Sequence, residues 1–470
     1  MLDQVGGSTL IEATMAEIRR LIATAPGARL PSIRRLAERQ GVSKSTVVEA
    51  YDRLVAQGAV AARPGSGFFA AGRVRPFALA ESGPSLDRAI DPLWIYRQSL
   101  TQQMSALHPG CGWLPDSWLP EDMVRRSLRA VARDETTNIS TYSVPQGLRP
   151  LREHLARRFT ERGLEVEPAA ILLTDSGSRA IDLVCRFLIQ PGDVVLVDDP
   201  CYFNFQSLLQ AQRARIIGVP YTRQGPDLER FASLCAEHRP KLYLTNAVLH
   251  NPTGATVSVG TAHRLLKLAE QHDFILAEDN IFADFEARPS PSLAALDGFE
   301  RVIHLGSFSK TLTAALRCGY IVARADWIEG LTDLALATGI GCSDVAAQTT
   351  LRLLTDGSYR RHLDSLRPRL ARAMAATAER LEGCGLRLWL EPQAGMFLWA
   401  ELPEGLDSAV IARKALERDV VMAPGNVFSV SRNAARFLRF NVAQSADKRI
   451  FDVLAEVMEK AAMPSPEGRG

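Results

Sequence analysis

The stretch GSFSKTLTAALRCGY spans residues 306–320 and places one lysine, Lys310, among small and hydroxyl residues. The apolar runs VIHL (302–305) and YIVA (320–323) flank it, so we expect Lys310 at the end of a buried strand. A lysine in such a place suits Schiff-base chemistry, and the guanidinium of Arg317 suits a phosphate. A single lysine is most often a solvated surface residue, so the interpretation depends on other segments.

Three further segments fit this chemistry. In TDSGSRAI (174–181), a predicted strand leads into Ser-Gly-Ser at a helix start, where free N–H groups and the helix dipole favour a phosphate. In HNPTG (250–254), an asparagine precedes a proline in a rigid turn. FILAEDN (274–280) is an apolar strand whose last acid, Asp279, suits the protonated nitrogen of a pyridine ring. Each segment alone is common, but the four together indicate the chemistry of pyridoxal phosphate (PLP).

Beyond residue 150, short apolar runs alternate with helical patterns. This alternation predicts an α/β large domain with a largely parallel sheet covered by helices. Residues 360–470 begin with a long helical stretch, followed by strands and a closing helix, and this predicts a smaller C-terminal α+β domain. The apolar runs are ILLT (171–174), VVLV (194–197), LYLT (242–245), FILAE (274–278), VIHL (302–305) and YIVA (320–323).

Residues 1–70 follow a different pattern. Helical periodicity over residues 9–24 and capping serines at Ser32 and Ser43 predict three helices. Two β-like runs surround the turn sequence PGSG (64–67) and predict a hairpin. Three helices and a hairpin form the pattern of a winged helix-turn-helix.

Composition and charge narrow the class of protein. The chain has 470 residues, 46% hydrophobic and 23% charged, which is ordinary for two or three globular units. Residues 1–75 carry 11 Lys or Arg against 6 Asp or Glu, a net of +5, and this is where a polyanion would bind. The first 30 residues do not resemble a signal peptide and no apolar run is long enough to span a membrane, so we expect a cytoplasmic protein. The seven cysteines include no CxxC pair, which favours free thiols and no metal site.

The stretch GARLPSIRRLAERQGVSKSTVVEAYDRLVAQGAVAARPGSGFFA (27–70) resembles the GntR family of winged-helix regulators over its whole length. The match includes LPS-x-R-x-LA, GVS-x-x-TV and the wing sequence GSG. The resemblance implies double-stranded DNA as a partner, with the third helix in the major groove. Residues at the start of that helix would meet base edges, an arginine would meet a phosphate, and wing glycines would allow close approach. The expected DNA-binding residues are Arg34, Ser43, Lys44, Ser45, Thr46, Gly65 and Gly67.

From about residue 100 to residue 460, the chain resembles the fold-type I aminotransferases. The resemblance implies that Lys310 binds PLP as a Schiff base, that Asp279 pairs with the pyridine nitrogen, and that Asn251 donates to the phenolic oxygen. It also implies that Tyr202 stacks on the ring and that Arg439 clamps the carboxylate of an amino acid. The expected phosphate contacts are Ser176, Gly177, Ser178, Ser307, Arg317 and the partner subunit's Tyr142, so we expect a homodimer with shared sites.

One position departs from the family pattern. Family members often carry a tyrosine three residues after the pyridine-binding aspartate, where this chain has Phe282. A phenylalanine cannot donate a hydrogen bond to the phenolic oxygen of the cofactor. The difference bears on aminotransferase competence and not on PLP binding.

A winged helix, a linker and an aminotransferase-like domain, in this order, resemble the MocR subgroup of GntR regulators, whose PLP domain usually serves as effector sensor and dimerisation module. We expect the winged helix over residues 1–73, the linker over 74–98, the large domain over 99–355 and the small domain over 356–462. The main hypothesis is a regulator that senses an amino-acid or amine effector through Lys310. The alternatives are a working aminotransferase with an accessory DNA-binding head and a PLP-free interaction module.

Overall fold

The computed structural model describes residues 10–24, 28–63, 66–70, 106–137 and 139–462. Two compact units make up the chain, Met1–Glu81 and Ser82–Gly470. The linker expected over residues 74–98 lies outside the described residues. No helix in the described ranges is long and apolar enough to cross a membrane.

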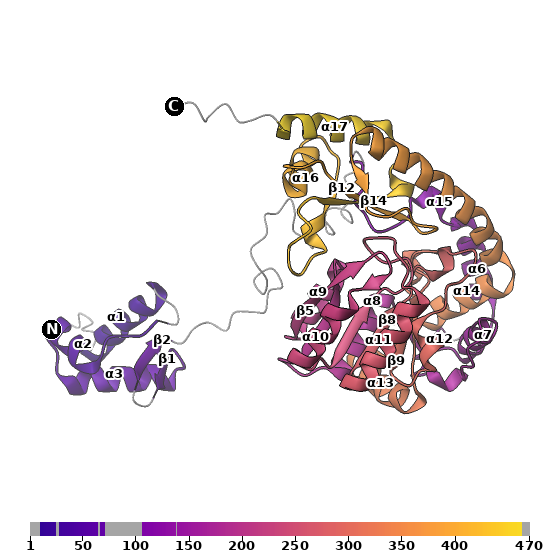
Figure 1. Cartoon of the computed structure of the whole chain (residues 1–470). Coiled ribbons are helices and arrows are strands. Elements are labelled where there is room, and N and C mark those ends of the chain that lie inside the picture. The colour runs from indigo at the N-terminus through magenta and orange to yellow at the C-terminus, as the bar shows by residue number, and fades with distance from the viewer. Residues whose placement is uncertain (1–9, 25–27, 64–65, 71–105, 138, 463–470) are drawn as a thin grey trace. The chain divides into compact units, whose positions relative to one another are not determined.

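The N-terminal unit has the predicted order of three helices and a hairpin (Figure 1). Ser32 and Ser43 cap the second and third helices through their side-chain oxygens, as expected. Gly41 ends the second helix in the left-handed conformation that glycine tolerates. A small core holds the helices together and includes Ile18, Leu36 and Tyr51, all fully buried. The elements are α1 (Leu10–Thr24), α2 (Ile33–Gln40), α3 (Lys44–Ala56), β1 (Val60–Arg63) and β2 (Gly67–Ala70).

The large domain of the second unit is built on an eight-stranded sheet. Its strand order is β3-β10-β9-β8-β7-β4-β5-β6. Strands β5, β4, β7, β8 and β9 are parallel, whereas β10 runs antiparallel to both of its neighbours. The bounds are β3 (Ile171–Thr174), β4 (Val194–Asp199), β5 (Arg215–Thr222), β6 (Gly225–Pro226), β7 (Leu242–Thr245), β8 (Ile275–Asp279), β9 (Val302–Ser307) and β10 (Gly319–Val322).

Helices cover both faces of this sheet (Figure 1). Side chains alternate along each strand, so Leu172 packs on one face while Leu173 packs on the other. The prediction of a helix-covered, largely parallel sheet is therefore confirmed. The face on which Leu172 packs is covered by α8 (Gly177–Leu188), α9 (Phe203–Ala211) and α13 (Ala325–Thr338). The other helices of this domain are α6 (Glu121–Arg133), α7 (Arg149–Thr160), α10 (Leu228–His238), α11 (Val259–His272), α12 (Leu293–Asp297) and α14 (Asp344–Thr355).

A smaller α+β domain follows, as predicted. The long helix α15 (Ser358–Gly383) leads into a four-stranded antiparallel sheet of order β11-β12-β14-β13. The sheet consists of β11 (Arg387–Leu388), β12 (Phe397–Glu401), β13 (Ala423–Pro424) and β14 (Phe437–Asn441), with helices α16 (Ser408–Leu416) and α17 (Lys448–Ala462). Short 3-10 turns are η2 (Asp116–Trp118), η3 (Pro168–Ala170), η4 (Ala283–Phe285), η5 (Ala314–Leu316), η6 (Gly425–Val427) and η7 (Val442–Gln444).

Candidate functional site

The carboxyl ends of the central strands converge on one cavity of about 280 Å³. Asn251 follows β7, Asp279 ends β8, and Lys310 follows β9 by three residues. Ligand sites in open α/β sheets form at this edge because loops leave it at neighbouring strands. Most of the residues expected to bind the cofactor or an amino acid line this cavity, namely Ser176, Gly177, Ser178, Tyr202, Asn251, Asp279, Lys310, Arg317 and Arg439.

Lys310 is half-buried and presents its amine to the cavity. Its Nζ donates to the carbonyl oxygen of Gly112 at 2.7 Å. Burial first, and then the cations Arg439 and Arg317, lower the pKa of Lys310 from 10.5 to about 8, against the raising effect of Cys111 and Asp279. A neutral amine is therefore accessible near physiological pH, and this is the form that attacks a carbonyl.

Asp279 is a buried carboxyl group with no arginine or lysine in an ion pair within the described residues. Burial raises its pKa to about 6, although hydrogen bonds and the nearby Lys310 lower it. The backbone N–H of Ile281 donates to its Oδ1 at 3.3 Å, and Asn246 donates to its backbone carbonyl at 2.9 Å. A buried carboxylate of this kind is stabilised by a cationic ligand, and a protonated pyridine nitrogen meets that need.

The opposite end of the cavity is suited to an anion. Ser176 caps α8, so the free N–H groups of this 12-residue helix face the cavity beside Gly177 and Ser178. Arg317 lines the same end. Ser307 lies behind the wall, where its Oγ is 2.9 Å from the Oγ of Ser309. Ser309, which sequence analysis did not single out, is the serine of this turn that lines the cavity.

Arg439 enters the cavity from the small domain, on β14. Its guanidinium donates to Oδ1 of Asn251 at 2.7 Å and to the carbonyl of Gly110 at 2.6 Å, and lies over the rings of Phe397 and Phe428. Its Nε is buried without a hydrogen-bond partner. Burial lowers its pKa to about 10, so the group stays charged at neutral pH. A carboxylate would satisfy this unpaired donor.

The segment 110–113 also belongs to the site, although its sequence did not predict this. The carbonyl groups of Gly110 and Gly112 accept from Arg439 and Lys310, and Trp113 lines the cavity. The only sequence signal was the pair of glycines in HPGCGW (108–113), which resembles an ordinary turn. Their role as acceptors depends on residues some 200 to 330 positions away.

The segment that follows Asp279 contributes no tyrosine to the cavity. Ile281 and Phe282 both line the cavity, and Phe282 is 3% exposed against the ring of Phe397. The amide oxygen of Asn251 accepts from Arg439, so its amide nitrogen is the end able to donate to a ligand. Phe282 therefore lies in the cavity, at the position where family members often carry a tyrosine.

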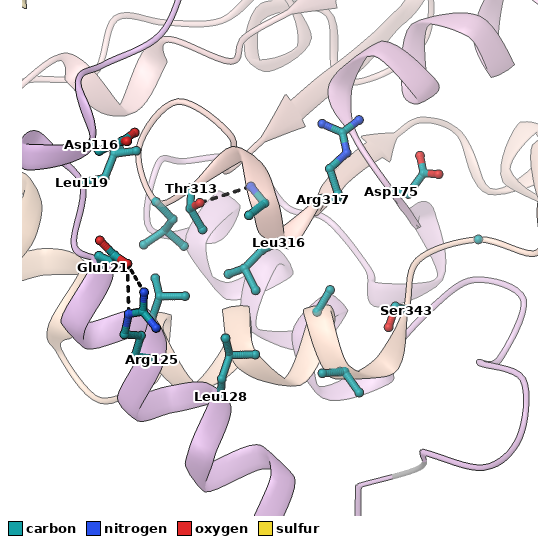
Figure 2. Close-up of a pocket in the computed structure, with 16 residues that line it drawn as sticks. Asp116, Leu119, Glu121, Arg125, Leu128, Asp175, Thr313, Leu316, Arg317 and Ser343 are labelled. Carbon is teal, nitrogen blue, oxygen red and sulfur yellow. Dashed lines mark hydrogen bonds and ion pairs between the residues drawn. The ribbon is translucent and has the colours of Figure 1, made fainter. Parts of the chain in front are cut away.

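Tyr142 does not line this cavity. Its side chain is 81% exposed, beside the exposed Ile139 and Val144. A second, larger cavity of about 760 Å³ shares Arg317 with the first. Figure 2 shows Arg317 and Leu316 at this second cavity, with the Glu121–Arg125 ion pair at its other end.

The N-terminal unit presents its expected DNA-binding residues at the start of α3. Lys44 and Ser45 are exposed there. Ser43 has a structural task, since its Oγ accepts from the N–H of Thr46 at 3.1 Å. Arg34 is 79% exposed and pairs with Glu38 at 3.0 Å, an exposed pair of little energy that a phosphate can replace.

The wing is described only in part. Gly67 has a φ of +97°, which favours glycine, and Gly65 lies outside the described residues. A side chain at Gly67 would lie 3.7 Å from the guanidinium of Arg29. Arg29 is thus a further cation at the wing that sequence analysis did not list.

Two family models match the chain. The class "Aminotransferase class I and II" matches residues 116–457, and "Bacterial regulatory proteins, gntR family" matches residues 10–70. The second match covers the described winged helix, and the first covers the cavity residues from Ser176 to Arg439.

Two relatives are similar to this chain over most of its length. The chain is 30% identical to the HTH-type transcriptional regulator YdcR of Escherichia coli, over 91% of this chain and 93% of YdcR. It is 29% identical to the probable rhizopine catabolism regulatory protein MocR of Rhizobium meliloti, over 84% and 82%. Among solved structures, LysN, the α-aminoadipate aminotransferase of Thermus thermophilus complexed with N-(5'-phosphopyridoxyl)-L-leucine, gives a TM-score of 0.72 at 25% identity over 78% of this chain and 95% of LysN.

These matches define a class of proteins in which a GntR-type winged-helix domain is joined to a fold-type I aminotransferase domain, whose cofactor is PLP. The chain belongs to the MocR-like subgroup of the GntR family of transcription regulators.

Proposed function

We propose that this chain is a cytoplasmic transcription regulator whose aminotransferase-like domain binds PLP and senses an amino-acid or amine effector. The observation that carries the proposal is the convergence of Lys310, Asp279 and Arg439 on one cavity in a chain that also has a GntR-type head. The head supplies binding to double-stranded DNA. The cavity supplies the signal.

In this proposal the cavity residues hold PLP along its length. Asp279 would hold the pyridine nitrogen, Asn251 would donate to the phenolic oxygen, and Tyr202 would lie against the ring. The α8 N-terminus, with Ser176, Gly177 and Ser178, would hold the phosphate together with Arg317 and Ser309. Ser307 fixes the orientation of Ser309. When bound, PLP supplies an aldehyde that condenses with amines and a ring that acts as an electron sink.

The effector is recognised at both of its ends. Its amine would lie on the Lys310 side of the cavity. Its carboxylate pairs with Arg439, which exchanges the carbonyl of Gly110 for a charged, two-pronged acceptor. Arg439 belongs to the small domain and Lys310 to the large domain, so an effector that contacts both favours one arrangement of the two.

A second candidate function is catalysis of transamination. It is favoured by the same three residues, which an aminotransferase also needs. The apolar pair Ile281 and Phe282 weakens it, because neither side chain can donate to the cofactor's phenolic oxygen. We therefore rank steady turnover below effector sensing.

We also propose that the protein acts as a homodimer. The exposed Ile139, Tyr142 and Val144 surround Ser143, whose Oγ accepts from the N–H of Asp344 at 3.1 Å, next to the largely apolar 760 Å³ cavity. A second copy of the chain would cover this surface. Arg317 lines both the 760 Å³ cavity, where Figure 2 shows it, and the cofactor cavity. The partner subunit's Tyr142 would reach the phosphate across this boundary.

The experiment compares binding of the purified, PLP-loaded protein to the DNA next to its own gene and to random DNA at several salt concentrations. The proposal predicts at least a hundredfold preference for specific DNA and a salt-dependent affinity. Parallel assays follow amino acids and keto acids for turnover. Equal affinity for both DNAs with steady turnover would favour the enzyme.

A further inference from the structure

A separate polar cavity of about 340 Å³ lies between α7, η4 and α15. It shares no lining residue with the cofactor cavity. Five arginines and a histidine line it, against three acids: Arg157, Arg158, Arg162, Arg360, Arg367 and His154 face Glu161, Asp284 and Asp364. With His154 neutral, five positive charges against three negative ones leave an excess of two.

One acid is held by two of these arginines. Asp284 is 2.7 Å from Arg162 and 3.0 Å from Arg158, and it accepts from the hydroxyl of Tyr359 at 2.5 Å. Although burial raises its pKa, Arg158 and Arg162 hold the pKa of this carboxyl well below its usual range. One carboxylate thus serves two guanidinium groups, and one positive charge remains.

The other arginines are less well neutralised. Arg360 and Arg367 share Asp364, each at 3.9 Å, which is longer than a hydrogen bond. Arg157 forms no ion pair within the described residues. Burial lowers the pKa of His154, and the positive charges of Arg158 and Arg157 lower it as well. The cavity therefore gathers N–H donors without enough acceptors.

The floor of this cavity connects to the cofactor residues. Tyr359 also lies 2.8 Å from the hydroxyl of Thr311, the residue after Lys310. Arg367 donates to the backbone carbonyl of Asp284 at 2.9 Å, on the turn that follows Asp279 and Phe282. A ligand that drew Arg162 or Arg367 toward itself would disturb Asp284 on η4. Through Tyr359, it would also disturb Thr311 beside Lys310.

We propose that this cavity is a second ligand site, which binds a compact phosphate-type dianion, free or carried by a small metabolite. Its charge would match the excess of two, and its oxygens would accept from the guanidinium groups of Arg157, Arg162 and Arg360. The site is distinct from the phosphate end of the cofactor cavity. Its occupation modulates the cofactor site through Tyr359 and η4.

The test is calorimetric titration of the full-length, PLP-loaded protein with inorganic phosphate, without DNA and with chloride holding the ionic strength constant. The double variant Arg157→Ser with Arg360→Ser removes two exposed cations and leaves the contacts of Asp284 intact. The control, Arg264→Ser with Arg372→Ser, removes the same charge from exposed positions outside the cavity. Thermal unfolding checks that all three proteins are folded.

We expect one phosphate per chain in wild type and in the control, and at least tenfold weaker binding in the cavity variant. Phosphate should also shift the visible band of bound PLP in wild type and not in the cavity variant. Equal phosphate affinity in wild type and cavity variant would overturn the proposal. A wild type that binds no phosphate would also overturn it. In that case, weaker DNA binding by the cavity variant, measured separately, would assign these arginines to the DNA backbone.

Discussion

Lys310 is held by the carbonyl of Gly112 in a cavity that disfavours its charge. Because burial lowers its pKa to about 8, half of the lysine is a neutral amine at that pH. The rate at which PLP-free protein captures PLP should therefore rise with pH and level off above about 8. Stopped-flow absorbance would measure this profile, and Lys310→Ala is the control that should show no pH-dependent capture. A midpoint near 10.5 would contradict the burial of the amine.

Arg439 should discriminate ligands by their carboxylate. Arg439→Lys keeps the charge but loses the two-pronged geometry, so an amino acid should perturb the PLP spectrum at about tenfold or higher concentration. The matching amine without a carboxylate is the control and should act equally on both proteins. Loss of PLP itself from the variant would show that Arg439 is structural, through its bonds to Asn251 and Gly110.

Single site residues could be predicted from the sequence where they adjoin a strand that the local sequence also predicts. Lys310 and Asp279 adjoin strands that their own sequence predicts, and both line the cavity. Ser309 could not be distinguished from Ser307, because their orientation depends on a hydrogen bond with each other and on Cys318. The acceptors Gly110 and Gly112 could not be predicted, because their partners are brought to them only by the folded chain.

Helix α3 combines a structural and a reading function at its first turn. Ser43→Ala removes the N-cap bond to Thr46 and should destabilise the N-terminal unit by about 1 kcal/mol. Lys44→Ala should leave the melting temperature unchanged and relax the preference at particular bases. Calorimetry and binding to a set of operator variants separate the two effects. A Lys44→Ala protein with unchanged base preference would remove Lys44 from the reading surface.

Arg34 on α2 should act on all sequences alike. Its guanidinium is exposed and its pair with Glu38 is easily exchanged, so Arg34→Ala should weaken specific and random DNA equally and lower the salt slope by about 1. Titrations at several salt concentrations measure this slope. A loss confined to one sequence would instead assign Arg34 to base recognition.

Helices and strands could be predicted from the sequence where apolar residues follow a single pattern or where a capping residue marks the start of a helix. The strands β3 and β7 coincide with the predicted runs, and Ser32 and Ser43 mark the helix starts. Strand β5 (Arg215–Thr222) was missed because Gly218 and Pro220 interrupt a half-buried run. The antiparallel direction of β10 was also beyond the sequence, since pairing direction depends on the connection in space.

For the whole molecule, the apolar face at residues 139–144 should hold the dimer together. Ile139→Asp places a charge at a side chain that is 74% exposed, so it should leave the fold intact and shift the protein toward monomer. Val259→Asp, at a 57% exposed position elsewhere, is the matched control. Analytical ultracentrifugation at micromolar concentration measures both. An Ile139→Asp protein that remains dimeric would move the interface to another face.

An amine bound at Lys310 should change the affinity of the protein for DNA. The most direct measurement is a DNA-binding titration of wild type and Lys310→Ala, each with and without the amine that perturbs the wild-type PLP spectrum. We predict that wild type changes its DNA affinity by the equivalent of about 1–3 kcal/mol. Lys310→Ala should bind DNA but not respond, because the amine has no lysine to displace. A wild type whose DNA affinity ignores the amine while it steadily converts it to a keto acid would contradict the account.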